Sequence, residues 1–163
     1  MAMNPSRSTG SNLQGPRDAG KSKTMLTPFR QGTVLVLTQN EQLSSVVSHA
    51  VESLGSTSPR LNCVRTLSDC LVAVRLLAPS LVILDDAALA NDGARALEDL
   101  LQLRAGTPVI YFASHHTLEL EREVRRLGVL FYVQMPASPD DLDTVLARIL
   151  GAFVRDARAR RAH

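Results

Sequence analysis

The chain has 163 residues, of which 45% are hydrophobic, and its formal net charge at pH 7 is +2. This length and apolar content suit one compact domain with a buried core of ordinary size. No run of about eighteen apolar residues occurs and the N-terminus has no hydrophobic signal segment, which argues against membrane insertion and secretion and predicts a cytoplasmic protein.

The charge is divided unevenly along the chain. Residues 1–31 carry five basic and one acidic side chain, and residues 151–163 carry four basic and one acidic. The part between them has nine basic and fourteen acidic side chains, so a mildly acidic domain lies between two basic ends. Basic ends attract nucleic acid through its phosphates, and we expect only weak, salt-sensitive binding of this kind.

Residues 1–31 are rich in Ser, Gly, Pro and basic residues and show no apolar periodicity. Burial cannot offset the entropy of ordering such a segment, so we predict a disordered leader. The stretch at 15–22 matches the pattern of a phosphate-binding loop. That loop functions only between a buried strand and a helix, because both aim its backbone amides. Neither flank has this pattern, and we predict no nucleotide site.

From residue 33 onward, short apolar runs alternate with amphipathic segments. The first expected elements are a strand at 33–37, a helix at 41–54, a strand at 61–64, a helix capped by Ser68 and stopped by Pro79, and a strand at 81–84. Then come a helix at 93–104, a strand at 108–112, a helix at 117–127, a strand at 129–133 and a helix that opens at Ser138. This alternation predicts an α/β fold with a doubly wound, five-stranded parallel sheet and five helices, whose ligand site lies at the carboxyl ends of the strands.

Side chains that often bind metal ions do not stand at ligand spacings. His115 and His116 are adjacent and share no face, and no third ligand accompanies them. Cys63 and Cys70 match no metal or redox motif and are predicted to be buried free thiols. We therefore predict no metal site from these residues.

A more particular pattern stands at the ends of the third and fifth strands. The run 81–85 ends in Asp85, and the turn at 91–93 ends eight residues later in Gly93. Tyr132 stands three residues before Met135, which precedes a proline. Over residues 32–150 this pattern resembles the CheY-like receiver domain of bacterial two-component response regulators. The resemblance implies the flavodoxin-like receiver fold, with Asp85 at the phospho-acceptor position and Tyr132 as the switch aromatic.

The family's metal pair is missing from this chain. The acidic pair that follows the first strand in receivers, and that holds Mg²⁺ beside the acceptor, is Thr38 and Gln39 here. Mg²⁺ requires several oxygen ligands with carboxylate charge, and Asp86 offers only one more carboxylate. We therefore expect no cofactor and, at most, weak Mg²⁺ binding.

Two other active-site positions also depart from the family. The lysine expected before the proline is Met135, and the hydroxyl expected at the end of the fourth strand is Ala113, with Ser114 beside it. Phosphoryl transfer depends on positioning and on neutralising the developing charge, so these changes remove the groups on which the reaction mainly depends. We predict that Asp85 is not phosphorylated and is an unpaired carboxylate that caps the strand end with nearby backbone amides.

The last helix carries an apolar stripe that continues farther than one small domain needs. Core packing accounts for its first half, and the predicted interface residues are Leu146, Ile149, Leu150, Phe153 and Val154. The receiver-like domain is predicted to span 32–154 and to be followed by a basic tail at 155–163. A dimer helix and a connector to an effector domain both remain open.

The resemblance and its departures together imply a pseudo-receiver. Such a module regulates a protein partner by contact, without phosphorylation, and is not an enzyme. The surface formed by the fourth and fifth helices and the fifth strand is a usual partner face in the family, and the mixed charges of the helix at 117–127 suit either docking or exposure to solvent. Two alternatives stay open: a phosphate-accepting receiver that uses Asp85 in a phosphorelay, and the N-terminal regulatory part of a transcriptional activator.

Overall fold

The structure, a computed structural model, describes residues 32–55, 58–90 and 92–159. The predicted leader at 1–31, with its phosphate-loop pattern at 15–22, lies outside these residues, and so does the end of the predicted basic tail, 160–163. None of the helices in the described ranges combines the length and the apolar content that crossing a lipid bilayer requires.

Five parallel strands form one sheet in the order β2-β1-β3-β4-β5. They are β1 (Thr33–Leu37), β2 (Arg60–Val64), β3 (Leu81–Asp85), β4 (Val109–Ala113) and β5 (Phe131–Gln134). Every residue of β3 and β4 is buried, which explains why these strands are continuous apolar runs in the sequence. The predicted parallel sheet is confirmed.

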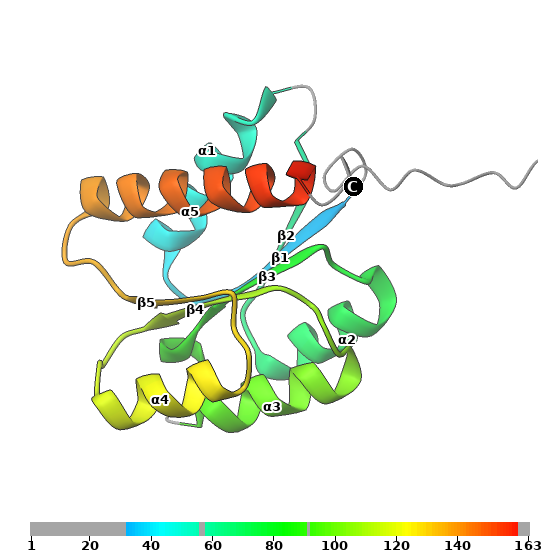
Figure 1. Ribbon diagram of the computed structural model, residues 1–163, viewed down its shortest axis with the longest axis vertical. Coiled ribbons are helices and arrows are strands. Elements are labelled where there is room, and N and C mark those ends of the chain that lie inside the picture. The colour runs from blue at the N-terminus through cyan, green and yellow to red at the C-terminus, as the bar shows by residue number, and fades with distance from the viewer. Residues whose placement is uncertain (1–31, 56–57, 91, 160–163) are drawn as a thin grey trace, which may run out of the picture.

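Helices cover both faces of the sheet (Figure 1). They are α1 (Glu41–Glu52), α2 (Leu67–Leu77), α3 (Gly93–Leu103), α4 (Leu118–Arg126) and α5 (Pro139–Ala159). One face is covered by α1 and α5, and the other by α2, α3 and α4. Each face has its own apolar cluster, with Val47 and Leu146 in the first and Val74 and Leu97 in the second.

The start of α2 differs from the prediction. Its N-cap is Thr66, whose backbone is extended and whose Oγ1 accepts the Asp69 N–H at 3.1 Å. The Thr66 hydroxyl also donates to the Asp69 carboxylate at 2.7 Å. Ser68, the predicted cap, lies inside the first turn of the helix. Serine and threonine are both good capping residues, so the sequence alone does not distinguish the two positions.

A short 3-10 helix, η2 (Asp86–Leu89), begins directly after β3 and is absent from the predicted elements. Its four residues are too few to show an apolar period. Because η2 begins where β3 ends, it places Asp85 at the junction of a strand and a helical turn.

The helix α5 continues past the predicted domain end at residue 154 and reaches Ala159. Leu146, Ile149 and Leu150 are buried in the core formed with α1 and the sheet, so the prediction that they form an interface is wrong. Phe153 and Val154 are partly buried against the same cluster. Packing within the chain therefore accounts for most of the apolar stripe.

Candidate functional site

Three segments meet at the carboxyl edge of the sheet. Thr38 follows β1, Asp85 closes β3 and Ser114 follows β4, and these three strands are neighbours. Parallel strands end at the same edge, so the topology gathers these residues where a doubly wound fold has its ligand site.

Asp85 is almost completely buried, with 1% of its surface exposed. The Thr38 hydroxyl donates a hydrogen bond to its Oδ2 at 2.6 Å, and the Ala87 N–H donates to its Oδ1 at 3.1 Å. Thr38 is buried as well, and its Oγ1 accepts the Asn40 N–H at 2.9 Å. The carboxylate therefore caps η2 through a backbone amide, and it has in addition a hydroxyl partner that the sequence does not reveal.

The surroundings of Asp85 disfavour its charged form. Burial raises the pKa of the Asp85 carboxyl above the ordinary value of 3.8, and the negative charge of Asp86 raises it further. The hydrogen bonds from Thr38 and Ala87 lower the pKa without cancelling the effect of burial. Asp85 takes no part in the ion pairs of the described residues, so no cation offsets the cost of ionising it.

Met135 is the residue that the sequence resemblance places at the lysine position of receivers. Its N–H donates to the Ala113 carbonyl at 2.8 Å, which extends the pairing of β5 with β4. Its side chain is partly buried and packs against the apolar cluster beneath α1 and α5. A thioether carries no charge and donates no hydrogen bond, so it cannot replace an ammonium group.

Asp86 is held by the segment that follows β4. Ser114 donates two hydrogen bonds to Asp86 Oδ1, from its N–H at 2.7 Å and from its Oγ at 2.6 Å. Ala113 is fully buried and brings no hydroxyl to the edge. The hydroxyl of this segment therefore comes from Ser114, one residue after the expected position, and it is already bonded to a carboxylate.

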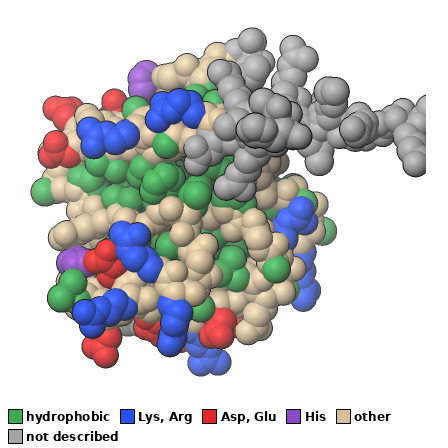
Figure 2. Space-filling view, viewed as in Figure 1, with side chains coloured by type: hydrophobic (Ala, Val, Ile, Leu, Met, Phe, Trp, Pro, Cys, Tyr) green, Lys and Arg blue, Asp and Glu red, His purple; other side chains and the backbone are tan. Residues whose placement is uncertain are grey.

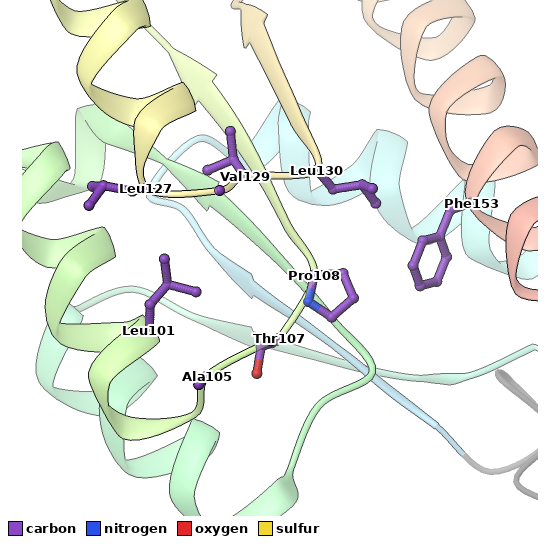
Figure 3. A pocket seen from close by; sticks show the side chains of 10 residues that line it. Leu101, Ala105, Thr107, Pro108, Leu127, Val129, Leu130 and Phe153 are labelled. Atoms are coloured by element: carbon purple, nitrogen blue, oxygen red, sulfur yellow. The ribbon is translucent and has the colours of Figure 1, made fainter.

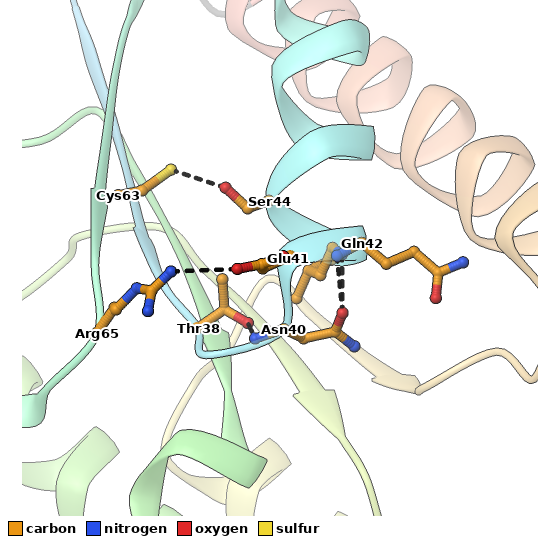
Figure 4. A network of polar contacts seen from close by, with 8 residues as sticks. Thr38, Asn40, Glu41, Gln42, Ser44, Cys63 and Arg65 are labelled. Atoms are coloured by element: carbon orange, nitrogen blue, oxygen red, sulfur yellow. Dashed lines mark hydrogen bonds and ion pairs between the residues drawn. The ribbon is translucent and has the colours of Figure 1, made fainter.

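The side chain of Gln39 does not point to Asp85 as the side chain of Thr38 does. Its Nε2 donates to the Arg65 carbonyl at 3.3 Å, and its side chain is exposed. Asn40 caps α1 with its side-chain oxygen, and Glu41 pairs with the Arg65 guanidinium at 3.6 Å (Figure 4). These contacts tie the loop after β1 to β2 and α1 and leave only Thr38 facing the acceptor position.

The same network includes one of the two cysteines. Ser44 Oγ lies 3.5 Å from Cys63 Sγ (Figure 4). Cys63 is exposed, contrary to the prediction, because β2 is an edge strand of the sheet, whereas Cys70 is buried as predicted. Both thiols are free.

The resemblance to receivers implies a divalent metal ion beside the acceptor carboxylate. Among the described residues, no group of three or more His, Cys, Asp or Glu side chains is arranged to hold a metal. Both oxygens of Asp85 accept hydrogen bonds from the protein, and Thr38 presents a neutral hydroxyl. Mg²⁺ prefers a nearly octahedral set of oxygens that includes carboxylates. The residues around Asp85 therefore do not fit a magnesium ion.

Tyr132, the predicted switch aromatic, is half-buried and stacks on Tyr111 of β4, with ring centroids 5.8 Å apart and planes inclined by 8°. Its hydroxyl lies 3.1 Å from His116 Nδ1, and the Arg125 guanidinium lies 5.7 Å from its ring centroid. Glu121 contacts Arg125 at 2.8 Å and His116 at 3.7 Å. Stacking, a hydrogen bond and a cation–π contact therefore fix Tyr132 between β4 and α4.

Tyr111 is a residue of this region that the sequence analysis misses. It is fully buried, and its hydroxyl has no hydrogen-bond partner among the described residues. The Oη lies against Gly93, where a Cβ atom would overlap it. Burial is the main cause that raises the pKa of the Tyr111 phenol, and the charge of Asp86 adds to it. Tyr111 and Tyr132 are paired in the register of β4 and β5, and this pairing places their two rings beside each other.

A larger cavity lies at the opposite edge of the sheet, where β4 and β5 begin (Figure 3). Its volume is about 630 Å³, and Leu101, Pro108, Leu127, Leu130 and Phe153 are among its lining residues. None of the side chains that line it is ionisable. The polar side chains around Asp85 and Asp86 therefore lie at the other edge of the sheet from this cavity.

No protein-family model matches the sequence, and no curated protein matches it. Solved structures do match its fold. The Mn²⁺-bound response regulator Rcp1 has a TM-score of 0.67 and 17% identity, and the match covers 76% of this chain and 94% of that chain. A CheY-like receiver domain protein from Methanospirillum hungatei has a TM-score of 0.65 and 17% identity, over 80% and 98% of the two chains. The signal receiver domain of a putative LuxO repressor from Vibrio parahaemolyticus has a TM-score of 0.63 and 20% identity, over 81% and 96%.

The strand order, the helices on both faces and the polar carboxyl edge define a doubly wound α/β protein. Within this class the chain has the fold of the response-regulator receiver domains, and the predicted resemblance is confirmed at the level of the fold.

Proposed function

We propose that this protein is a pseudo-receiver of two-component signalling, which regulates a protein partner by contact and takes up no phosphoryl group. The observation that carries the proposal is the state of Asp85. Its side chain is buried, and both of its oxygens accept hydrogen bonds from Thr38 and Ala87. The hydroxyl of Thr38 faces the acceptor carboxylate where an active receiver has a metal-binding carboxylate.

The chemistry of phosphoryl transfer supports the same conclusion. The acceptor must be ionised and accessible, and cations must neutralise charge on the transferring group. Here burial raises the pKa of Asp85, and Met135 supplies no charge. Asp86, the other carboxylate at this edge, is bonded twice by Ser114. The site therefore lacks the groups that would lower the barrier to attack on phosphorus.

The neighbours in structure support a signalling role. They include response regulators and the receiver domain of a putative repressor, and one is described as a phosphorylated phytochrome response regulator. These descriptions apply to those proteins. For this chain they favour a module that passes a signal to a protein partner, with no catalytic activity of its own.

The partner surface that we propose is formed by α4, β5 and α5. Figure 2 shows apolar side chains gathered between α5 and β5, with charged side chains of both signs over α4. Glu119, Arg122, Glu123 and Arg126 line a shallow depression of about 360 Å³ on α4. An apolar centre with a charged rim is the composition expected of a protein interface.

The test exposes the chain to acetyl phosphate or beryllofluoride with millimolar Mg²⁺ and measures intact mass and backbone amide spectra. We expect no modification and no spectral change. The triple variant Thr38→Asp, Gln39→Asp, Met135→Lys restores the acidic pair and the cation, and it should gain one phosphoryl group that Asp85→Asn removes. A stoichiometric, Asp85-dependent mass gain in the unaltered chain would overturn the proposal and establish a phosphate-accepting receiver.

A second candidate is the regulatory part of a transcriptional activator. The helix α5 continues to Ala159, beyond Leu150, which is the last fully buried residue up to position 155, where the description of side-chain burial in this helix ends. One structural neighbour is the receiver domain of a putative repressor. A receiver that controls an effector domain also acts by contact, so the absence of phosphorylation is expected for both candidates. Binding of an isolated effector domain by this chain would distinguish the second candidate from a free-standing adaptor.

A further inference from the structure

Most of the exposed large apolar side chains of the described residues gather on two adjacent helices. Five such side chains are exposed, and four of them belong to α2 and to the end of α3. Val72 is 55% exposed and Leu76 77%, and Leu77 and Leu103 complete the group. The fifth, Leu118, lies apart at the start of α4. A concentration of this kind marks an interaction surface more often than scattered exposed leucines do.

The outward side of α2 is apolar although the core does not need it. The residues that α2 buries are Cys70, Ala73 and Val74. Val72 and Leu76 are one turn apart and therefore lie on a common side of the helix, which points away from the sheet. Burying these two side chains against a second molecule would remove their apolar surface from water, which favours association.

A shallow groove of about 520 Å³ runs beside these side chains, between α2 and α3. Leu71, Val72 and Arg75 line it from α2, and Asp99, Gln102 and Leu103 line it from α3. We call this groove, together with Leu76, the α2–α3 face. Within the described part of the chain, neither Arg75 nor Asp99 has an ion-pair partner within 4.0 Å.

The charges make this face complementary to itself. A cation stands on the α2 wall and an anion on the α3 wall, with apolar side chains between them. A two-fold rotation about an axis through the groove places Arg75 opposite Asp99 of a second copy, and Asp99 opposite Arg75 of that copy. It also brings the apolar strips of the two copies together, as an isologous contact requires.

We propose that the α2–α3 face binds a second copy of this chain and forms a two-fold symmetric dimer. This contact does not involve the apolar stripe of α5, which the core largely uses. It also leaves the surface of α4, β5 and α5 open, so the proposal does not depend on the function proposed above.

The first test measures the dimer dissociation constant of the full chain by sedimentation over a dilution series. Leu76→Gln removes an exposed apolar side chain and should raise this constant about tenfold or more. Leu118→Gln is the matched control, because Leu118 is also exposed, at 66%, but lies on α4. Thermal melts should show both variants to be folded. A monomer throughout a series that reaches about 1 mM overturns the proposal, and so does a dimer that Leu76→Gln leaves intact.

The second test exchanges the two charges. Arg75→Glu alone and Asp99→Arg alone each place like charges together at both symmetric positions, and each should raise the dissociation constant about fivefold. The double variant restores opposite charges at both positions and should return the constant to within about twofold of the parent. If the dissociation constant of the double variant stays as high as those of the single variants, the two residues do not face each other. The proposal is then overturned, and the groove would suit a different protein.

Discussion

At the scale of single residues, the hydrogen bond from Thr38 to Asp85 is a buried polar contact at the carboxyl edge of the sheet, and the stability of the fold should depend on it. Thr38→Val keeps the shape of the side chain but removes the donor to Asp85 and the acceptor of the Asn40 N–H. We expect the free energy of unfolding at pH 7 to fall by about 1–3 kcal/mol, because buried polar groups lose partners. Urea denaturation measures this loss. Thr38→Ser keeps the hydroxyl and should lose less, and equal stability of the valine variant and the parent would contradict the argument.

The raised pKa of Asp85 predicts a pH dependence with a definite sign. A carboxyl whose pKa is higher in the folded protein than in the unfolded chain binds more protons when folded, so its contribution to stability decreases as pH rises. The decrease begins near the ordinary value of 3.8 and is complete above the raised pKa. Asp85→Asn carries no such charge, and above this window it should be as stable as the parent or slightly more stable. Urea denaturation of both proteins from pH 4 to pH 8 tests this, and a large loss at pH 7 would exclude it.

At the scale of elements, the contact between α3 and β4 depends on Gly93. A Cβ at this position would overlap the Tyr111 hydroxyl, so Gly93→Ala should lower the free energy of unfolding by about 1–3 kcal/mol. Tyr111→Phe removes a buried hydroxyl that has no partner within the described ranges, and it should be neutral or stabilising by about 1 kcal/mol. In the Tyr111→Phe background, Gly93→Ala should cost less. Chemical denaturation of the four proteins measures this coupling, and strict additivity would argue against the close approach.

The packing of α5 on α1 predicts that two apolar residues of the same stripe respond differently. Leu146 is fully buried, so Leu146→Ala should lower the free energy of unfolding by about 2–5 kcal/mol. Phe153 is only partly buried, at the edge of the same cluster. Replacing a fully buried aromatic side chain by alanine costs about 3–5 kcal/mol, and Phe153→Ala should cost distinctly less than this. Thermal and urea melts of the two variants decide this. A larger loss for Phe153→Ala would show that the core extends farther along α5.

The order and type of the elements can be predicted from the sequence, because apolar runs and helical stripes alternate clearly from residue 33 onward. Local alternatives are harder to decide. Thr66 and Ser68 both suit a cap, and η2 is too short to have a period. In the site, the topology places Thr38 and Asp85 at one edge, but their hydrogen bond joins residues 47 positions apart and depends on side-chain orientation that no local pattern encodes.

At the scale of the whole molecule, the carboxyl edge and the α2–α3 face share no residue. Asp85 and its partners lie at the ends of β1 and β3 and in η2, whereas the dimer contact uses the outward sides of α2 and α3. Effects at sites without common partners are usually additive. Asp85→Asn should therefore leave the dimer dissociation constant within about twofold of the parent, as measured by sedimentation. A larger change would reveal coupling between the two regions.

The hydroxyl that faces Asp85 has a consequence for how such a protein is controlled in a cell. A receiver with an accessible acceptor alternates between an unphosphorylated and a phosphorylated state, and its output depends on how often a kinase supplies phosphoryl groups. Under the pseudo-receiver function proposed above, Asp85, which is buried and bonded by Thr38 and Ala87, takes up no phosphoryl group and does not alternate in this way. On the function proposed here, the amount of the protein becomes the variable that sets its output, so control passes to its synthesis and turnover, and stray phosphodonors produce no false signal.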